Sequence, residues 1–91
     1  MLHGVMEASL IQRVQPDYPP IARAARIAGR VELRVILVLD GTVRHIEGLS
    51  GNPLLVHAAG SAVRQWRYRR TLLSGEPVEV ATIIAVDFRL Q

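Results

Sequence analysis

The side chains most often used in catalysis and metal binding are scattered along this chain rather than gathered into a motif. None of the three histidines has ligand spacing to another, and the chain contains no cysteine to complete a zinc site. No serine lies in a nucleophile-elbow context, and the acidic residues occur singly. The sequence therefore predicts no metal, no cofactor and no enzymatic activity.

An arginine-rich stretch with two aromatic residues is the first group with recognisable binding chemistry, and it comprises Arg64, Trp66, Arg67, Tyr68, Arg69 and Arg70. Arginines interleaved with aromatic rings can stack on single-stranded nucleic acid. The same arginines also follow a predicted helix, whose dipole favours positive charge at its C-terminus. We predict a solvated helix end and no nucleic-acid partner, and retain a small basic nucleic-acid-binding module as an alternative function.

The segment from Val78 to Leu90 offers a different chemistry, main-chain hydrogen bonding. It shows the cleanest two-residue alternation in the chain, and its thirteen residues exceed the usual three to ten of a strand. A hairpin with arms of about eight residues cannot pair with all of it. Some donors and acceptors are expected to stay free and to accept another strand, either from a partner or from a second copy of the chain.

The composition bounds the scaffold that must position these residues. With 91 residues, 49% of them hydrophobic and 21% charged, the chain is expected to fold as one small domain. All eleven basic residues are arginine, and the formal charge is +3. No apolar run is long enough to span a membrane, and residues 1–10 lack the pattern of a signal peptide.

The first half of the chain contains the signals for a short strand, a helix and a hairpin. We expect a strand from Leu10 to Val14, and a helix from Pro20 to Ala28 ended by Gly29. Ile21, Ala25 and Ala28 are expected on its buried side. A strand with one core face follows, formed by Val31, Leu33, Val35, Leu37 and Leu39. Asp40-Gly41 then turns the chain into a return strand from Val43 to Leu49.

The second half contains the signals for a longer helix before the C-terminal strand. Asn52 is the expected N-cap, and Pro53 the first helical residue. The apolar stripe of this helix comprises Leu54, Leu55, Ala58, Ala59, Ala62, Val63 and Trp66, and Gly60 lies inside it. The elements together predict an α+β fold in which two helices pack on one face of a three-stranded antiparallel sheet, with a short extra N-terminal strand left open.

Three stretches, "QPDYPPIARAARIAGRVELRVILVLDGTV", "LSGNPLLVHAAGSAVRQWRYRR" and "GEPVEVATIIAVDFRL", follow one another in a characteristic order and spacing. Together they resemble the TonB C-terminal domain, over roughly Leu10 to Leu90. One position differs, because the family usually has proline where this chain has Arg70. The resemblance implies a domain at residues 10–91, with residues 1–9 as an N-terminal extension.

The resemblance also implies a function. TonB-family energy transducers couple the inner-membrane proton-motive force, through ExbB and ExbD, to outer-membrane transporters of siderophores, vitamin B12 and similar nutrients. The transporter's TonB box pairs as an added strand with the last strand of the domain. The domain is periplasmic and is tethered to the inner membrane by a region that precedes it in the full-length protein.

Site residues follow from the resemblance and from the predicted edge. Receptor binding is assigned to Gln15, Pro16 and Asp17 of the proline-rich segment and to Glu79, Val80, Ala81, Thr82, Ile83, Ile84 and Ala85 of the last strand. Structural roles are assigned to Tyr18, Pro19, Gly29, Asp40, Gly41, Trp66 and Tyr68. Pairing of the same edge with a second copy would give a homodimer, which is kept as a further alternative.

Overall fold

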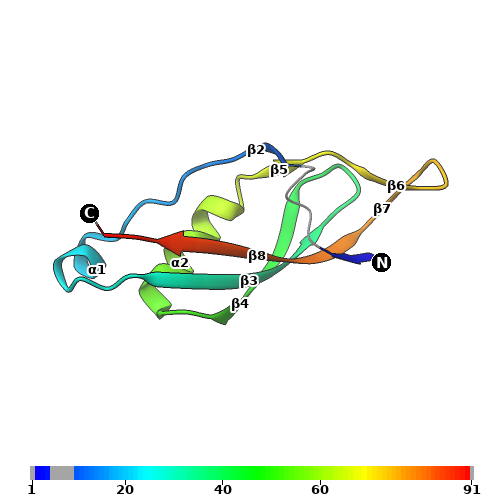
Figure 1. Ribbon diagram of the computed structural model, residues 1–91. Helices are drawn as coiled ribbons and strands as arrows, with labels where there is room; N and C mark the ends of the chain where they lie inside the picture. Colours follow the sequence, from blue (N-terminus) through cyan, green and yellow to red (C-terminus); the bar gives the residue numbers. More distant parts are fainter. Residues whose placement is uncertain (1, 5–9, 91) are drawn as a thin grey trace.

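The computed structural model describes residues 2–4 and 10–90 of the chain. The molecule is elongated, with principal extents of 49 × 21 × 17 Å, and its main sheet runs along the long axis (Figure 1). That sheet has the strand order β1-β8-β3-β4, formed by Leu2–Gly4, Val80–Phe88, Gly29–Leu37 and Val43–Ser50. β3 is antiparallel to β8 and β4, and β1 is parallel to β8.

The three-stranded antiparallel part confirms the predicted alternation. Val31, Leu33 and Val35 of β3 are fully buried. Leu39, predicted on the same face, is 52% exposed because β3 ends at Leu37 and Leu39 lies in the turn that follows. In that turn the N–H of Gly41 donates to the carbonyl of Val38 at 2.9 Å.

The end of the β3–β4 turn depends on a glycine and an aspartate. Gly41 has φ +87°, a left-handed conformation that favours glycine. Asp40 Oδ1 accepts hydrogen bonds from the hydroxyl of Thr42 at 2.7 Å and from its backbone N–H at 3.0 Å. These bonds, led by the one from the hydroxyl, lower the pKa of Asp40. The predicted Asp40-Gly41 turn is therefore present, with Leu39 and Asp40 as its turn residues.

Helix α1, Pro20–Ala24, is shorter than predicted. Arg26 adopts a positive φ of 55°, and the N–H of Ile27 donates to the carbonyl of Ala22 at 2.8 Å, which closes the helix end. The prediction of a helix to Ala28 capped by Gly29 is therefore wrong, and Gly29 is the first residue of β3.

The predicted buried side of α1 is also wrong. Ala22 is the residue of α1 that is buried, whereas Ile21 is 71% exposed. The three prolines that precede and open the helix set its approach to the sheet, and this approach cannot be read from helical spacing.

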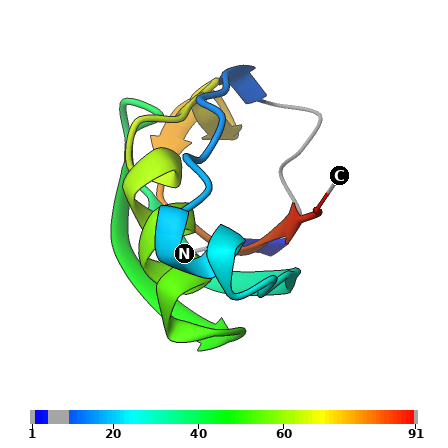
Figure 2. The same ribbon diagram turned by 90° about the vertical axis from the view of Figure 1, so that its left-hand side faces the viewer.

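Helix α2, Pro53–Val63, begins as predicted, because Asn52 Oδ1 accepts the N–H of Leu54 at 2.9 Å. Four of its residues, Leu55, Ala59, Ala62 and Val63, are buried. Together with Ala22 of α1, helix α2 packs on one face of the sheet, which curls around it (Figure 2). This arrangement confirms the predicted α+β class.

The close approach of α2 to the sheet occurs at Gly48 of β4 and not at Gly60 of the helix. A Cβ placed at Gly60 would lie 3.8 Å from Ile46 Cγ2, an ordinary contact. A Cβ placed at Gly48 of β4 would lie 2.7 Å from Val56 Cγ1, closer than side chains tolerate. Gly48 is therefore the position at which close packing of the helix on the sheet requires a residue without a side chain.

Two further pairs of short strands lie outside the main sheet. β2, Leu10–Gln12, pairs with β5, Arg67–Tyr68, so the expected N-terminal strand exists but ends at Gln12 instead of Val14. β6, Thr71–Leu73, and β7, Glu76–Val78, form a hairpin whose turn residues Ser74 and Gly75 both have positive φ.

This hairpin corrects the predicted C-terminal strand. Val78 pairs with Thr71 in the hairpin, and Leu90 lies beyond the strand, so β8 spans Val80–Phe88 rather than Val78 to Leu90. On the side that faces β3, every residue of β8 is paired, because the β3–β8 register runs without a break from Val80↔Leu37 to Phe88↔Gly29. Any free edge must lie on the other side of β8.

Candidate functional site: the outer edge of β8

The outer edge of β8 is only partly covered. β1 pairs in parallel with its first three residues, in the register Leu2↔Val80, His3↔Ala81 and Gly4↔Thr82. From Ile83 to Phe88, no other strand of the described residues 2–4 and 10–90 pairs with this side. Because β3 holds the other side in register, these six residues present an ordered, extended edge.

The residues predicted for this edge fall into three groups. Glu79 lies between β7 and β8 and belongs to neither strand. Val80, Ala81 and Thr82 are the residues that β1 already pairs with. Ile83, Ile84 and Ala85 lie on the uncovered part. Ile84 points into the core, whereas Ile83 is 47% exposed on the opposite face of the sheet.

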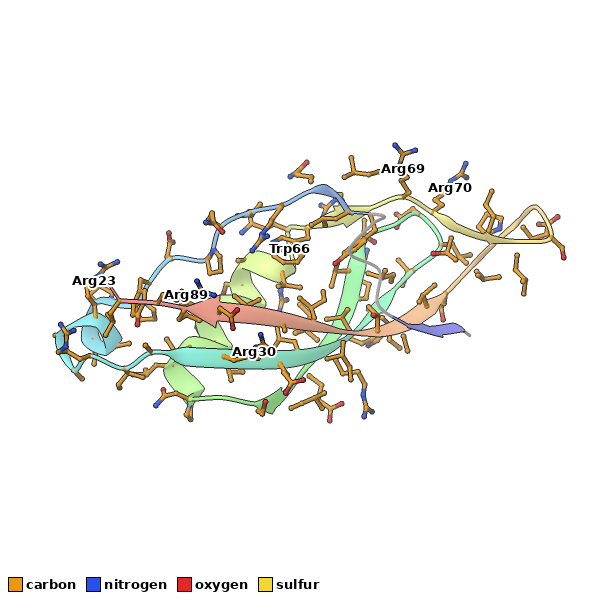
Figure 3. All side chains as sticks on the ribbon, viewed as in Figure 1. Arg23, Arg30, Trp66, Arg69, Arg70 and Arg89 are labelled. Carbon is orange, nitrogen blue, oxygen red and sulfur yellow. The ribbon has the colours of Figure 1, made fainter. Side chains whose placement is uncertain are left out.

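A cavity of about 230 Å³ lies beside the uncovered edge. It is lined by Leu10, Arg13, Trp66 and Tyr68 together with residues 83–85 of β8. Trp66 is held in place because its Nε1–H donates to the carbonyl of Val14 at 2.8 Å. The guanidinium of Arg13 lies 5.2 Å from the centre of the Trp66 ring, within cation–π range. The edge therefore has a recess beside it whose lining combines apolar and aromatic side chains with the cation of Arg13. Trp66, which lines the recess, is labelled in Figure 3.

Leu10 and Arg13 were not among the predicted site residues. Both belong to the N-terminal stretch that pairs with β5, and this pairing brings them to an edge about seventy residues further along the chain. No local pattern in the sequence carries that information. The predicted strand at Leu10 to Val14 was the available signal, but it did not identify its partner.

The proline-rich segment faces a different hollow. Gln15 and Asp17, both exposed, line a cavity of about 340 Å³ together with His57, Ser61 and Gln65, from α2 and the turn after it. Neither of the two residues lines the recess at β8. The structure therefore does not bring Gln15 and Asp17 into one pocket with Ile83 to Ala85.

Tyr18 links the same segment to the far end of β8. Its hydroxyl donates to the carbonyl of Ile27, and its ring meets Phe88 edge-on at 5.5 Å. The Arg23 guanidinium lies 4.8 Å from the centre of the Tyr18 ring. Pro19, the next residue, is the N-cap of α1. These contacts hold the proline-rich segment against the body of the domain.

The tip of the β3–β4 hairpin contacts Tyr68, one of the residues that line the recess. The N–H of Tyr68 donates to the carbonyl of Gly41 at 3.0 Å. A Cβ at Gly41 would lie 2.0 Å from the carbonyl oxygen of Tyr68, so only glycine fits there. Trp66 and Tyr68 are 4% and 3% exposed, which removes the exposed stacking platform that the nucleic-acid alternative requires.

The exposed face of β8 carries one well-formed ion pair. Arg30 Nε donates to Asp87 Oδ1 at 3.0 Å, and Arg89 approaches the other carboxylate oxygen at 3.8 Å (Figure 3). The hydrogen bond from Arg30 lowers the pKa of Asp87 and raises the pKa of Arg30. Because these side chains are exposed, the pair contributes little to stability.

Two kinds of feature are absent from residues 2–4 and 10–90, a metal-binding cluster and a membrane-spanning helix. No group of three or more histidine or acidic residues there is arranged to hold a metal ion. No helix in the same ranges is long and apolar enough to cross a membrane.

Comparisons with known proteins place the chain in context. Residues 14–90 match the family described as Gram-negative bacterial TonB protein C-terminal. The chain is 37% identical over 82 residues to Protein TonB of Klebsiella pneumoniae, which covers 88% of this chain and 32% of that protein. It is 33% identical over 81 residues to Protein TonB of Vibrio cholerae serotype O1, covering 87% of this chain and 33% of that protein. The chain thus spans about a third of the length of these curated relatives.

Solved structures share the fold. The solution NMR structure of the Pseudomonas aeruginosa TonB CTD superposes with a TM-score of 0.75, covering 90% of this chain and 85% of that chain at 24% identity. The tonb2 protein from Vibrio anguillarum superposes with a TM-score of 0.68, covering 96% of this chain and 85% of that chain, also at 24% identity. These similarities establish the architecture independently of the sequence match.

Proposed function

Because the chain belongs to the Gram-negative bacterial TonB protein C-terminal family, we propose that it is the periplasmic binding module of an energy transducer that serves outer-membrane transporters. The module binds an extended segment of the transporter, the TonB box, and catalyses no reaction. In the full-length protein it is tethered to the inner membrane and acts with ExbB and ExbD. The cargo belongs to the class of siderophores, vitamin B12 and related nutrients.

The observation that carries this proposal is the uncovered edge of β8 from Ile83 to Phe88. A strand that adds to a sheet edge gains affinity from main-chain hydrogen bonds and specificity from pockets for alternate side chains. Both components are available here. The backbone of β8 is held in register by β3, and the recess under Leu10 and Arg13 opens beside residues 83–85.

The residues that line the recess indicate which type of side chain of the bound segment it accommodates. Its lining combines Leu10 and the edges of two nearly buried rings with the charged Arg13, so it favours a side chain with both apolar and polar parts. Arg13 at its rim favours an acidic residue close by in the bound segment. Val80, Ala81 and Thr82 contribute main-chain hydrogen bonds to a partner on this side only when β1 leaves the edge. Glu79 precedes them outside the strand and is proposed as a flanking contact.

The proline-rich segment is proposed as a second, weaker contact. Gln15 carries an amide donor and an acceptor on the surface, and Asp17 a carboxylate, while Pro16 is half-buried beside them. A bound segment that continues past the β8 recess reaches them only by turning towards α2, because their hollow lies against that helix. Gln15→Ala is therefore expected to weaken binding by about 0.5–1.5 kcal/mol, the net value of one hydrogen bond.

Hydrogen exchange on the complex with a transporter-segment peptide tests the proposal. Strand addition protects alternate amides between Ile83 and Phe88, because only every second N–H of an edge strand points outward. Binding through side chains alone would leave these amides unchanged, and that result would contradict the proposal.

Two controls accompany this experiment. Arg13→Ala should weaken binding of a peptide with an acidic residue more than binding of the same peptide with glutamine in its place. Sedimentation of the free protein over a range of concentrations detects self-pairing, because a homodimer through the same edge would compete with the peptide.

A further inference from the structure

A second concave site lies away from the β8 edge, where the start of β4 meets the end of α2. Its volume is about 480 Å³, and its lining includes Thr42, Arg44, His45, Arg64 and Arg67. We call this site the basic groove. None of its lining residues is acidic, so three guanidinium groups and an imidazole share one hollow without an opposite charge among them.

The side chain of one of the arginines, Arg67, is held by the backbone around it. Arg67 Nη1 donates to the carbonyl of Trp66 at 2.9 Å and to the carbonyl of Arg64 at 3.4 Å. Arg64 is the C-cap residue of α2. A side chain already fixed by such bonds loses less conformational entropy when it binds a ligand.

The β4 side of the groove contains a strained residue. His45 has φ 52°, an uncommon conformation for a residue other than glycine, at a point where the β3–β4 register shifts between the Arg34 and Ile36 pairs. A bulge of this kind re-aims neighbouring side chains, and backbone strain concentrates at functional sites. Here it lies between Arg44 and Ile46, both of which line the groove.

Salt bridges and the dipole of α2 do not account for all the positive charges of the basic groove. The three salt bridges seen among residues 10–90 involve Arg30, Arg34 and Arg89, none of which lines the groove. The dipole of α2 favours Arg64 and Arg67 at its C-terminus but has no bearing on Arg44 and His45 of β4. Asp40 lies within electrostatic range of Arg44 but is engaged by Thr42 and lies outside the groove lining.

We propose that the basic groove binds a phosphate-bearing ligand. Guanidinium groups present paired donors that match the oxygens of a phosphate, and three arginines line the groove. A peptide strand is a poor occupant, because the bulge at His45 interrupts the regular edge of β4. The volume is within the range of sites for small ligands. A soluble phosphate ester and a phospholipid headgroup carry the same chemistry.

NMR titration of the whole chain at low salt tests this proposal with three probes. These are inorganic phosphate, glycerol 3-phosphate, and vesicles of phosphatidylglycerol compared with vesicles of phosphatidylcholine. We expect the amide shifts to centre on Arg44, His45, Arg64 and Arg67. Saturation by glycerol 3-phosphate identifies a soluble ester as the source. Binding to phosphatidylglycerol vesicles without a response to glycerol 3-phosphate identifies the headgroup.

The double variant Arg44→Gln with Arg64→Gln provides the specificity test. Both side chains are exposed, so the fold is expected to survive, which a thermal melt verifies. Binding should weaken at least about tenfold, as expected for the loss of two charge-assisted hydrogen bonds. The matched control, Arg69→Gln with Arg70→Gln, removes the same charge outside the groove (Figure 3). An equal loss in both variants, or binding of none of the probes, would overturn the proposal.

Discussion

Two glycines on facing elements illustrate how differently the same residue type can act in this small core. Gly48 of β4 lies directly under Val56 of α2, and an added methyl group would meet Val56 Cγ1 at 2.7 Å. Gly60 lies in the interior of α2, where a methyl group would make an ordinary contact with Ile46. The first glycine is required by packing, whereas the second only lowers the stability of the helix.

Gly60→Ala is expected to stabilise the domain by about 1 kcal/mol, the difference in helix propensity between the two residues. Gly48→Ala is the matched variant and is expected to destabilise it by roughly 1–3 kcal/mol through overpacking. Urea denaturation of both proteins measures the two effects. If Gly60→Ala lowered the midpoint, the helix would be packed more tightly against β4 than the structure indicates.

Single residues also mark the limit of what the sequence could predict. Trp66 is buried as expected, with an exposure of 4%, but it lies beyond the end of α2 at Val63 and so is not part of the helical stripe to which it was assigned. Leu54, assigned to the same stripe, is 39% exposed. The position of Arg13 above the Trp66 ring could not be predicted, because it depends on the pairing of β2 with β5. Contacts between residues this far apart in the sequence leave no periodic signal.

Among the elements, β1 and the partner strand proposed above compete for one edge. β1 covers Val80, Ala81 and Thr82 and leaves the rest of that side of β8 open. Three paired residues are a short strand, and short strands are held weakly unless side chains add to the pairing. The full edge is therefore available to a partner only at the cost of removing β1.

Deletion of residues 1–9 is expected to tighten binding of a transporter-segment peptide by a few-fold to about tenfold, because β1 no longer has to be displaced before the full edge can pair. Calorimetry on the deleted and full chains measures the change. A synthetic peptide of residues 1–9 added to the deleted chain should restore the weaker binding. Unchanged affinity would mean that the partner uses only Ile83 to Phe88.

The elements whose signals are local were predicted well, and those fixed by neighbours were not. The N-cap of α2 and the alternation of β3 are encoded within a few residues each, and both are present. Helix α1 ends early because Arg26 adopts a left-handed conformation that usually favours glycine. The sequence pattern predicts the end of this helix at Gly29 instead. The β6–β7 hairpin is absent from the predicted elements, although its two turn residues, Ser74 and Gly75, have the positive φ values of a tight hairpin turn.

At the scale of the whole molecule, the β6–β7 hairpin stands apart from the core. It projects from the end of the domain opposite α1 (Figure 1). None of residues 71–78 is buried, and Leu72 and Leu73 are each more than half exposed. An extension of this kind adds little to the buried apolar area that stabilises the domain.

Replacement of residues 72–77 by Asn-Gly is expected to shift the melting temperature by less than roughly 5 °C, which corresponds to about 1 kcal/mol for a domain of this size. Thr71 and Val78 are paired neighbours, so a two-residue turn can close the gap. Tyr68→Ala is the comparison, because this ring is buried and its loss should cost several kcal/mol. A large drop in the hairpin variant would assign the hairpin a role in the core.

The unbroken register of β8 with β3 has a mechanical consequence. Both strands run along the long axis of the molecule (Figure 1). A partner segment paired with β8 and pulled along that axis would load all its hydrogen bonds at once, in shear, instead of opening them one after another from an end. The β3–β8 ladder carries the same tension, but it is nine residues long and backed by buried side chains on both strands. Under tension the bound segment should therefore detach before the domain unfolds, and the domain would remain ready to bind again.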